Sequence, residues 1–332
     1  MDIERRVSET IRKYNLLNKK DKVVVALSGG KDSTSVLYIL KNLGYDVEGL
    51  MIDLGLGSWS EMHKKNMEKI CFDLGIKFSV VELKKEIGQG ICFIKAVLKK
   101  KKNLTGCTVC GVIKRWILNK EARRLGADKI VTGHNLDDEC QTVLMNFLKG
   151  NIFLGVNSTP ATGVDLVVNS FSDSKGAHPL SSRGVVQPTH SEESKYVSEN
   201  TQGIDTERGY ENSFGRIISA RRDLSEAHKK FVQRVKPLFF VPENEIRKYA
   251  KRKKFAINFD RCPCAFGTYR VETRGWMEEM KDADKLKVVK SWQKIIPKLK
   301  KKNFEREINE CEICGEPTVG KVCNACGILG EL

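Results

Sequence analysis

Apolar and polar residues are arranged along the chain in blocks that predict strands followed by helices. The apolar run Val23 to Leu27 comes before a helix-like stretch, Thr34 to Leu43, and this order recurs along the chain. The other strand-like runs are Val47 to Leu54, Lys77 to Leu83, Lys129 to Gly133 and Arg234 to Val241. Helical periodicity extends over Met1 to Asn18, Glu61 to Leu74, Cys140 to Leu148 and Glu243 to Lys253. Strands that alternate with helices indicate a doubly wound, parallel α/β sheet.

One long segment breaks this order and sets the predicted domain boundaries. Between Val156 and Arg216 there are ten serines and no sustained apolar period, so we expect a mobile insertion, with at most a short strand at Val164 to Val168. The predicted regions are 1–20 (an amphipathic helix), 21–154 (the first part of the α/β domain), 155–226 (the insertion), 227–304 (the rest of that domain with a basic helical region) and 305–332 (a small cysteine-rich module).

Composition favours a soluble protein that binds a polyanion. The chain has 332 residues, Lys and Arg exceed Asp and Glu by 58 to 42, and the formal net charge is +16. No charged-then-apolar leader opens the sequence, and no apolar run approaches the ~18 residues of a membrane span. We therefore expect a cytoplasmic protein, with no membrane association, whose basic surface binds nucleic acid. Lysine runs alone would also fit an ordinary solvated surface.

A glycine-containing loop follows the first predicted strand. The hexapeptide Ser28-Gly29-Gly30-Lys31-Asp32-Ser33 stands between the run ending at Leu27 and the helix from Thr34. A parallel strand delivers such a loop to the carboxyl edge of a sheet, where backbone N–H groups and the helix dipole favour an anion. The Walker spacing is absent, and the loop resembles the PP-loop of ATP pyrophosphatases, which split ATP between the α and β phosphates. A Gly-Gly turn with incidental polar neighbours is the alternative.

Four cysteines near the end of the chain predict a zinc site. Two Cys-x-x-Cys pairs, separated by eight residues, are formed by Cys311, Cys314, Cys323 and Cys326. Four thiolates satisfy a tetrahedral zinc ion without an open coordination position, so the site should be structural. We expect metal binding to fold this module, because its apolar content is low.

The remaining cysteines leave several interpretations open. Cys107 and Cys110 form a further Cys-x-x-Cys pair, which fits a redox pair, half of a metal site or two unrelated core thiols. Cys262, far downstream, could reach the same pocket at the carboxyl edge of the sheet. Three protein thiolates would leave one iron of a 4Fe-4S cluster open to an exogenous sulfur species, and a thiol or persulfide mechanism is the alternative. The residues interpreted as core thiols are Cys71, Cys92 and Cys140.

These motifs follow one another in an order that resembles the TtcA/TtuA family of tRNA 2-thiouridine synthetases, with the archaeal TtuA/NcsA branch most similar. The matching segments are Ser28 to Ser33, Ile52 to Gly55, Cys107 to Gly111, Gly133 to Glu139, Val235 to Leu238, Cys262-Pro263 and the C-terminal cysteine quartet. The resemblance implies that ATP adenylates the C2 oxygen of a tRNA uridine with release of pyrophosphate, and that sulfur then displaces AMP. It favours neither the wobble position nor the T-loop.

The resemblance also assigns roles to individual residues. The residues implied to bind ATP are Ala26, Ser28, Gly29, Gly30, Lys31, Asp32 and Ser33 at the phosphates, with Ile52 and Gly133 at the adenosine. Lys114 would neutralise charge on the α-phosphate, and Asp138 with Asp137 would hold Mg²⁺ or orient the uridine. Structurally, Lys114 could instead be an ordinary exposed helix lysine, and Asp137 could simply cap the following helix.

The family pattern further implies metal ligands and partners. Cys107, Cys110 and Cys262 would ligate a 4Fe-4S cluster that accepts sulfur from a ubiquitin-like sulfur-carrier protein or another donor. Cys264 stands where the family more usually has an aromatic residue, which leaves open whether Cys262 or Cys264 is the third ligand. This chain starts at the amphipathic helix, where related proteins commonly have a second zinc module. We expect a homodimer.

Two other functions compete with tRNA thiolation. Another PP-loop enzyme, which modifies tRNA or amidates its substrate with a nitrogen nucleophile, would use the same loop but gives no account of the three cysteines. A non-catalytic, zinc-containing RNA-binding protein would bind tRNA without turning over ATP, and the intact loop at Ser28 to Ser33 argues against it.

Overall fold

A computed structural model of the chain describes residues 2–102, 106–162, 226–259, 262–263, 269–303 and 308–332. These residues belong to one unit, formed by Met1–Leu166 and Ser225–Leu332. Most of the predicted insertion, including the short strand expected at Val164 to Val168, lies outside the described residues. Within the described part, no helix combines the length and the apolar character that crossing a membrane requires.

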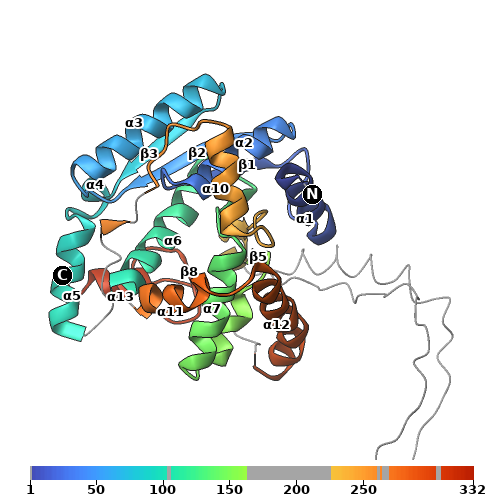
Figure 1. Cartoon of the computed structure of the whole chain (residues 1–332). Helices are drawn as coiled ribbons and strands as arrows, with labels where there is room; N and C mark the ends of the chain where they lie inside the picture. The colour runs from blue at the N-terminus through green and yellow to red at the C-terminus, as the bar shows by residue number, and fades with distance from the viewer. Residues whose placement is uncertain (1, 103–105, 163–225, 260–261, 264–268, 304–307) are drawn as a thin grey trace, which may run out of the picture. The chain divides into compact units, whose positions relative to one another are not determined.

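Helices and strands alternate through most of the described chain (Figure 1). The strands are β1 (Lys22–Leu27), β2 (Asp46–Asp53), β3 (Phe78–Glu82), β4 (Lys129–Val131), β5 (Ala161–Thr162), β6 (Gln233–Val235), β7 (Asn309–Glu310) and β8 (Pro317–Thr318). The helices are α1 (Ile3–Tyr14), α2 (Lys31–Asn42), α3 (Ser58–Asp73), α4 (Leu83–Ile87), α5 (Ile91–Lys102), α6 (Gly106–Arg124), α7 (Leu136–Leu148), η1 (Ile152–Asn157), α9 (Glu226–Lys229), α10 (Glu243–Arg252), α11 (Tyr269–Glu278), α12 (Asp282–Asn303) and α13 (Asn324–Leu329).

The central sheet has the strand order β3-β2-β1-β4-β6-β5. All neighbouring strands are parallel except β5, which pairs antiparallel with β6 at one edge. The order reverses direction at β1, so helices must cross over on both faces, and the predicted doubly wound α/β fold is confirmed.

The side chains of β1 show how the two faces are covered. Val23, Val25 and Leu27 belong to a core with residues of α1, α2, α3 and α10. Val24 belongs to a second core with residues of α5 and α6. Because successive strand side chains point to opposite faces, a continuous apolar run is what a strand buried on both sides requires.

One predicted strand is shorter than expected. Strand β6 ends at Val235, whereas the apolar run continues to Val241. The following residues form tight turns, in which Phe239 N donates to Lys236 O at 3.1 Å and Val241 N donates to Leu238 O at 2.8 Å. Pro237 has no N–H for a sheet ladder. Of the apolar side chains after it, Phe239 and Phe240 enter the core beside α7 and α11, whereas Leu238 and Val241 join the core with α1 and α10.

Candidate functional site

The loop between β1 and α2 is held in shape by its own hydrogen bonds. The hydroxyl of Ser33 accepts from Ser28 N at 3.2 Å and lies 3.2 Å from Gly30 O, to which it donates. Gly29 has φ +80°, and the ring of His63 occupies the place where its Cβ would be. Glycine is therefore required here both by the backbone conformation and by the space available.

The end of β4 lies against the first turn of α2. A Cβ on Gly133 would be 2.7 Å from Ser33 N, a separation at which one of the two segments would have to move. Gly133 thus brings the loop after β4 into close backbone contact with the PP-loop helix. This contact joins two of the sequence motifs at the carboxyl edge of the sheet.

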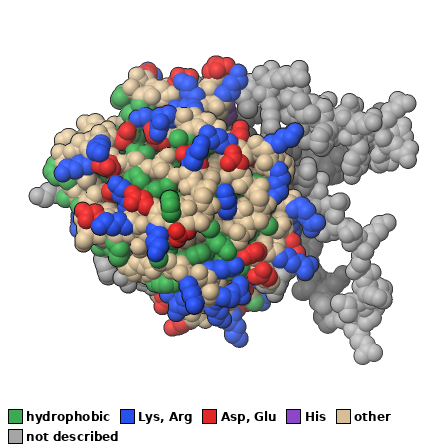
Figure 2. All heavy atoms as spheres, turned by 90° about the horizontal axis from the view of Figure 1, so that it is seen from above, with side chains coloured by type: hydrophobic (Ala, Val, Ile, Leu, Met, Phe, Trp, Pro, Cys, Tyr) green, Lys and Arg blue, Asp and Glu red, His purple; other side chains and the backbone are tan. Residues whose placement is uncertain are grey.

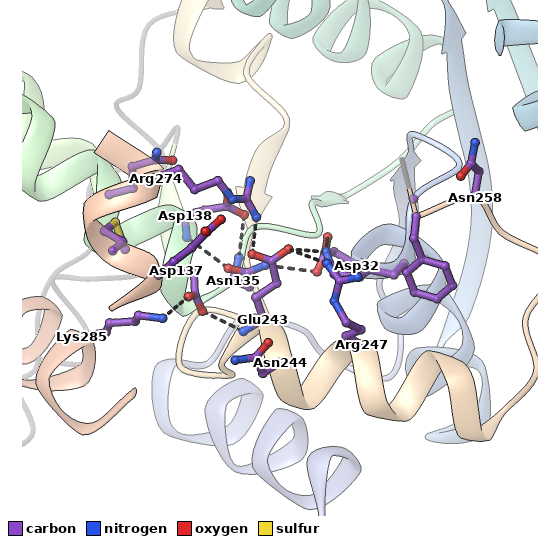
Figure 3. A pocket seen from close by; sticks show the side chains of 16 residues that line it. Asp32, Asn135, Asp137, Asp138, Glu243, Asn244, Arg247, Asn258, Arg274 and Lys285 are labelled. Carbon is purple, nitrogen blue, oxygen red and sulfur yellow. Dashed lines mark hydrogen bonds and ion pairs between the residues drawn. The ribbon is translucent and has the colours of Figure 1, made fainter. Parts of the chain in front are cut away.

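A pocket of about 520 Å³ opens beside this loop (Figure 3). Its walls come from the first turn of α2, from α7 and from the later helices α10, α11 and α12. The lining residues are Gly30, Lys31, Asp32, Asn135, Asp137, Asp138, Gln141, Glu243, Asn244, Arg247, Asn258, Phe259, Arg274, Met277, Glu278 and Lys285.

Glu243 is the centre of an ion-pair network in the pocket. Its carboxylate lies 2.7 Å from Lys31 Nζ and also pairs with Arg274 of α11. Lys31 in turn lies 2.9 Å from Asp32. Burial would raise the pKa of Glu243, but Lys31 and Arg274 outweigh it and hold that pKa below its ordinary value. Burial raises the pKa of Asp32, and the nearby charge of Lys31 offsets only part of this increase.

The two adjacent aspartates of α7 have different surroundings. Asp137 accepts a hydrogen bond from Glu243 N at 2.7 Å and pairs with Lys285 of α12 at 2.6 Å. Asp138 forms a capping box with Asn135, and its other oxygen lies 3.8 Å from an Arg270 nitrogen. Both carboxylates line the pocket. The two oxygens of Asp137 join α7 to α10 and α12, whereas Asp138 has only one weak ion pair.

The structure divides the predicted ATP and catalytic residues between two places. Gly30, Lys31, Asp32, Asp137 and Asp138 line the pocket. The residues that do not line it are Ala26, Ser28, Gly29, Ser33, Ile52, Lys114 and Gly133. Ala26 and Ile52 pack against the core on the α5 and α6 face, and Lys114 is a half-buried residue of α6. Gly30 lines the pocket, and Gly133 contacts the backbone of Ser33 in the first turn of α2.

Sequence reasoning did not find Glu243, Arg274 and Lys285 as site residues. The only local signal was acidic sequence at the start of the predicted helix from Glu243. Lys31 and Glu243 are 212 positions apart, so no periodicity or motif spacing could have joined them.

The predicted cluster cysteines are only partly described. Cys107 belongs to α6, but its side chain lies outside the described residues, as does Cys264. Cys110 is half-buried and packs against the core on the α6 face, and Cys262 is half-buried. The ligand set therefore stays a prediction.

The expectation of core thiols is confirmed for Cys71 and Cys140 and is wrong for Cys92. Burial raises the pKa of Cys71 to about 11 and that of Cys140 to about 12. Cys92 is exposed, because α5 turns Ile91 and Ile94 toward the core and leaves the position between them at the surface.

The C-terminal cysteines come together as a metal site would require. The sulfurs of Cys311, Cys314, Cys323 and Cys326 all lie within 4.8 Å of one another. The Cys314 and Cys323 sulfurs are 3.7 Å apart, close to the ~3.8 Å edge of a tetrahedron with Zn–S bonds of about 2.3 Å. Burial raises the pKa of Cys311, but backbone N–H donors outweigh it and lower the value to about 6. The donor set fits a structural zinc ion.

Helix α6 anchors this module. Trp116 packs against the cysteine cluster, and Asn119 Nδ2 donates to Glu316 Oε2 at 2.8 Å. Arg123 forms an ion pair with the same carboxylate. One helix thus carries Cys107, Cys110 and Lys114 in its first half and the contacts to the cysteine module in its second.

Comparisons with known proteins match the chain to a PP-loop domain and to tRNA 2-thiolation proteins. The model of the PP-loop domain family matches residues 1–169. The chain is 31% identical over 335 residues to the tRNA-5-methyluridine(54) 2-sulfurtransferase of Pyrococcus horikoshii, with 98% of this chain and 84% of that protein covered. It is 29% identical over 348 residues to the tRNA 2-thiolation protein NcsA of Haloferax volcanii, with 99% and 90% covered.

A solved structure supports the fold. The U34-tRNA thiolase NcsA from Methanococcus maripaludis, determined with its 4Fe-4S cluster, matches with a TM-score of 0.65. Sequence identity is 23%, and the match covers 99% of this chain and 87% of that one. The fold therefore extends across both the α/β domain and the C-terminal module.

Proposed function

We propose, from the premise that this chain belongs to the PP-loop family of tRNA 2-sulfurtransferases, that it uses ATP to activate the C2 oxygen of a tRNA uridine and then replaces that oxygen with sulfur. The oxygen leaves with AMP, and pyrophosphate is released in the first step. The observation that carries this proposal is the position of the PP-loop: Gly30 lines the charged pocket, and Ala26, at the end of the preceding strand, packs in the same core as Cys110 of α6.

The residues of the chain can be given roles on this basis. Backbone N–H groups of the loop and of the first turn of α2 would hold the phosphates, because that helix N-terminus carries no competing side-chain cap. Lys114 would neutralise charge at the α-phosphate. Asp138 would orient the uridine or hold Mg²⁺, which would stabilise the charge of the leaving pyrophosphate. Asp137 would act mainly by fixing the positions of α10 and α12.

We also propose the cofactors and partners that the family resemblance implies. Cys107, Cys110 and Cys262 would hold a 4Fe-4S cluster, which would supply a metal site for sulfur. The sulfur would come from a ubiquitin-like carrier or another donor. The C-terminal quartet would bind zinc. The basic charge would serve tRNA binding. Figure 2 shows Lys and Arg interspersed with acidic groups on one face, so we expect contacts distributed over a broad surface. A homodimer in the cytoplasm is the expected assembly.

The central experiment combines metal analysis with nucleoside analysis. Protein purified without oxygen is assayed for iron, sulfide and zinc, and tRNA from a deletion strain is analysed by mass spectrometry at each uridine. The names of the relatives point to two different positions, U34 and U54, so the analysis has to be resolved by site. Unchanged 2-thiouridine at every position in the deletion strain would overturn the proposal.

A variant pair tests the role of Asp138. Asp138→Asn keeps an acceptor for the capping box, so the fold of α7 should persist while thiolation is lost. Asp73→Asn, at an exposed position at the end of α3, is the matched control and should restore 2-thiouridine in the deletion strain. Full restoration by Asp138→Asn would exclude a direct role for this carboxylate.

A further inference from the structure

Two arginines near the carboxyl edge of the sheet carry charge that no acidic group within the described ranges balances. Arg115 belongs to α6, one residue after Lys114, and Arg234 belongs to β6. Among the residues that the structure describes, neither guanidinium has an ion pair or a side-chain hydrogen bond. Other cations at this edge do have carboxylate partners, as Lys31 and Lys236 show with Glu243 and Glu139.

The two arginines come from different elements but share one side of the sheet. Val235 belongs to the core on the α1 and α10 face, so the preceding residue, Arg234, points to the face covered by α5 and α6. The Arg115 guanidinium folds back along α6, since its Nη1 is 3.1 Å from where a Cβ on Gly111 would lie. Arg115 is also within electrostatic reach of Cys110.

Holding these two charges together has a cost. Arg234 is half-buried, and burial together with the charge of Arg115 lowers the pKa of Arg234 to about 10. It remains protonated at neutral pH, so the two positive groups repel each other. A half-buried charge such as that of Arg234 is ordinarily paired. Val232 N donates to Asn119 Oδ1 at 2.9 Å, which brings α6 against the residue just before β6. Arg115 lies one helical turn before Asn119 and Arg234 two residues after Val232, and the two charges are within electrostatic reach of each other. Two guanidinium groups facing the same space match the charge of a phosphate, to which each can donate two hydrogen bonds.

We propose, resting on the function proposed above, that Arg115 and Arg234 together bind one phosphate group of the RNA backbone beside the nucleotide that is thiolated. The phosphates of ATP already have the loop from Ser28 to Gly30. The acceptor nucleotide has to lie between that loop and the sulfur on the Cys110 side. A base that reacts there has to leave its stack, which draws its flanking phosphates toward the protein.

Salt-dependent tRNA binding tests this assignment. The full-length protein is titrated with unmodified tRNA transcript at several KCl concentrations, by fluorescence anisotropy, for the wild type, Arg115→Gln and Arg234→Gln. Loss of one phosphate contact should lower the magnitude of the slope of log K against log salt by about 0.7–0.9. Affinity should fall by about tenfold or more. Arg5→Gln, an exposed arginine on α1 that removes the same charge, is the matched control.

The outcomes separate the possible sources of the phosphate. Unchanged tRNA affinity and slope in both variants overturns the proposal, and so does an equal loss in Arg5→Gln, which would mean that the slope follows total charge only. A loss of ATP affinity with unchanged tRNA binding overturns the RNA assignment. Binding is measured without sulfur transfer, so a wild-type protein that fails to thiolate tRNA would refute the proposed function and leave this result intact.

Thermal melting gives a second readout that does not depend on tRNA. Because the two guanidinium groups repel each other, Arg115→Gln should melt at or above the wild-type temperature in low-salt buffer. Millimolar inorganic phosphate should raise the melting temperature of the wild type more than that of Arg115→Gln or Arg234→Lys. Equal phosphate responses in all three proteins would contradict a built anion site. Since Arg115 is exposed, its variant should fold even where a substitution at Arg234 does not.

Discussion

Replacing Lys285 with methionine tests how firmly the later helices are attached to the pocket. Lys285 is 4% exposed, and its Nζ lies 2.6 Å from Asp137, whose other oxygen accepts from Glu243 N. Methionine keeps the length of the side chain but leaves the Asp137 carboxylate without its cation. The second partner of Lys285, Asp282, is 3.5 Å away and 43% exposed, so it contributes little.

The expected cost follows from this geometry. Breaking a buried ion pair from one side costs about 3–5 kcal/mol, and we expect about 3 kcal/mol here because Asp137 keeps a backbone donor. That is a large share of a total of about 5–15 kcal/mol, and it corresponds to a fall in Tm of roughly 4–6 °C, since the unfolding entropy is about 2.1 cal/mol/K per residue. The double variant Asp137→Asn with Lys285→Met should recover much of the loss, because no buried charge is then unpaired.

The pH dependence gives an internal check. Burial alone would lower the pKa of Lys285, but the hydrogen bond and charge of Asp137 raise it above its ordinary value of 10.5. Its stabilising contribution is therefore complete below pH 10.5 and is lost as the pH rises through the higher value in the folded protein. The stability gap between wild type and Lys285→Met, measured by urea unfolding, should be constant from pH 7 to about pH 10 and begin to close only above pH 10.5. A gap below about 1 kcal/mol at pH 7, or purely additive effects in the double variant, would refute the reasoning.

Three further predictions concern the loop, the network and the metal module. Glu243→Gln removes the charged partner of Lys31. Because the pKa of Glu243 is lowered in the folded state, the stability difference from wild type should be complete above pH 4.5 and shrink at lower pH. Urea midpoints of the two proteins that stay equally separated at pH 3 would contradict this. Gly133→Ala should weaken ATP binding in calorimetry, because its Cβ would lie 2.7 Å from Ser33 N, and wild-type affinity would show that the loop moves freely. Cys314→Ser should reduce bound zinc, measured by mass spectrometry, and lower the melting temperature; one zinc per chain with unchanged melting would exclude a role for this thiol.

Local sequence was sufficient to predict most of the sheet. Strands β1, β2 and β3 lie within about one residue of their predicted bounds, because strands buried on both faces need continuous apolar runs. The run from Arg234 to Val241 misled the prediction because apolar content alone does not separate a strand from turns that pack into a core. Cys92 was misassigned for a related reason, since its apolar neighbours hide its place on the outer side of α5.

The chemical site was predictable only where its parts are contiguous in sequence. The loop from Ser28 to Ser33 and the Asn135 cap with Asp138 are local structures, set by residues within six positions of one another. The contact of Lys31 with Glu243 depends on packing α10 beside α2, and no short-range pattern encodes it. The same holds for the pair formed by Arg115 and Arg234.

The sequence by itself therefore determined the α/β fold, the phosphate loop and the four-cysteine module, because strand burial, glycine conformations and ligand spacing are properties of short segments. The tertiary structure alone decided which carboxylate faces Lys31, which of the two aspartates has only a weak ion pair, and which arginines have no acidic partner among the described residues. Charges interact over distances set by packing, and separations along the chain do not report those distances.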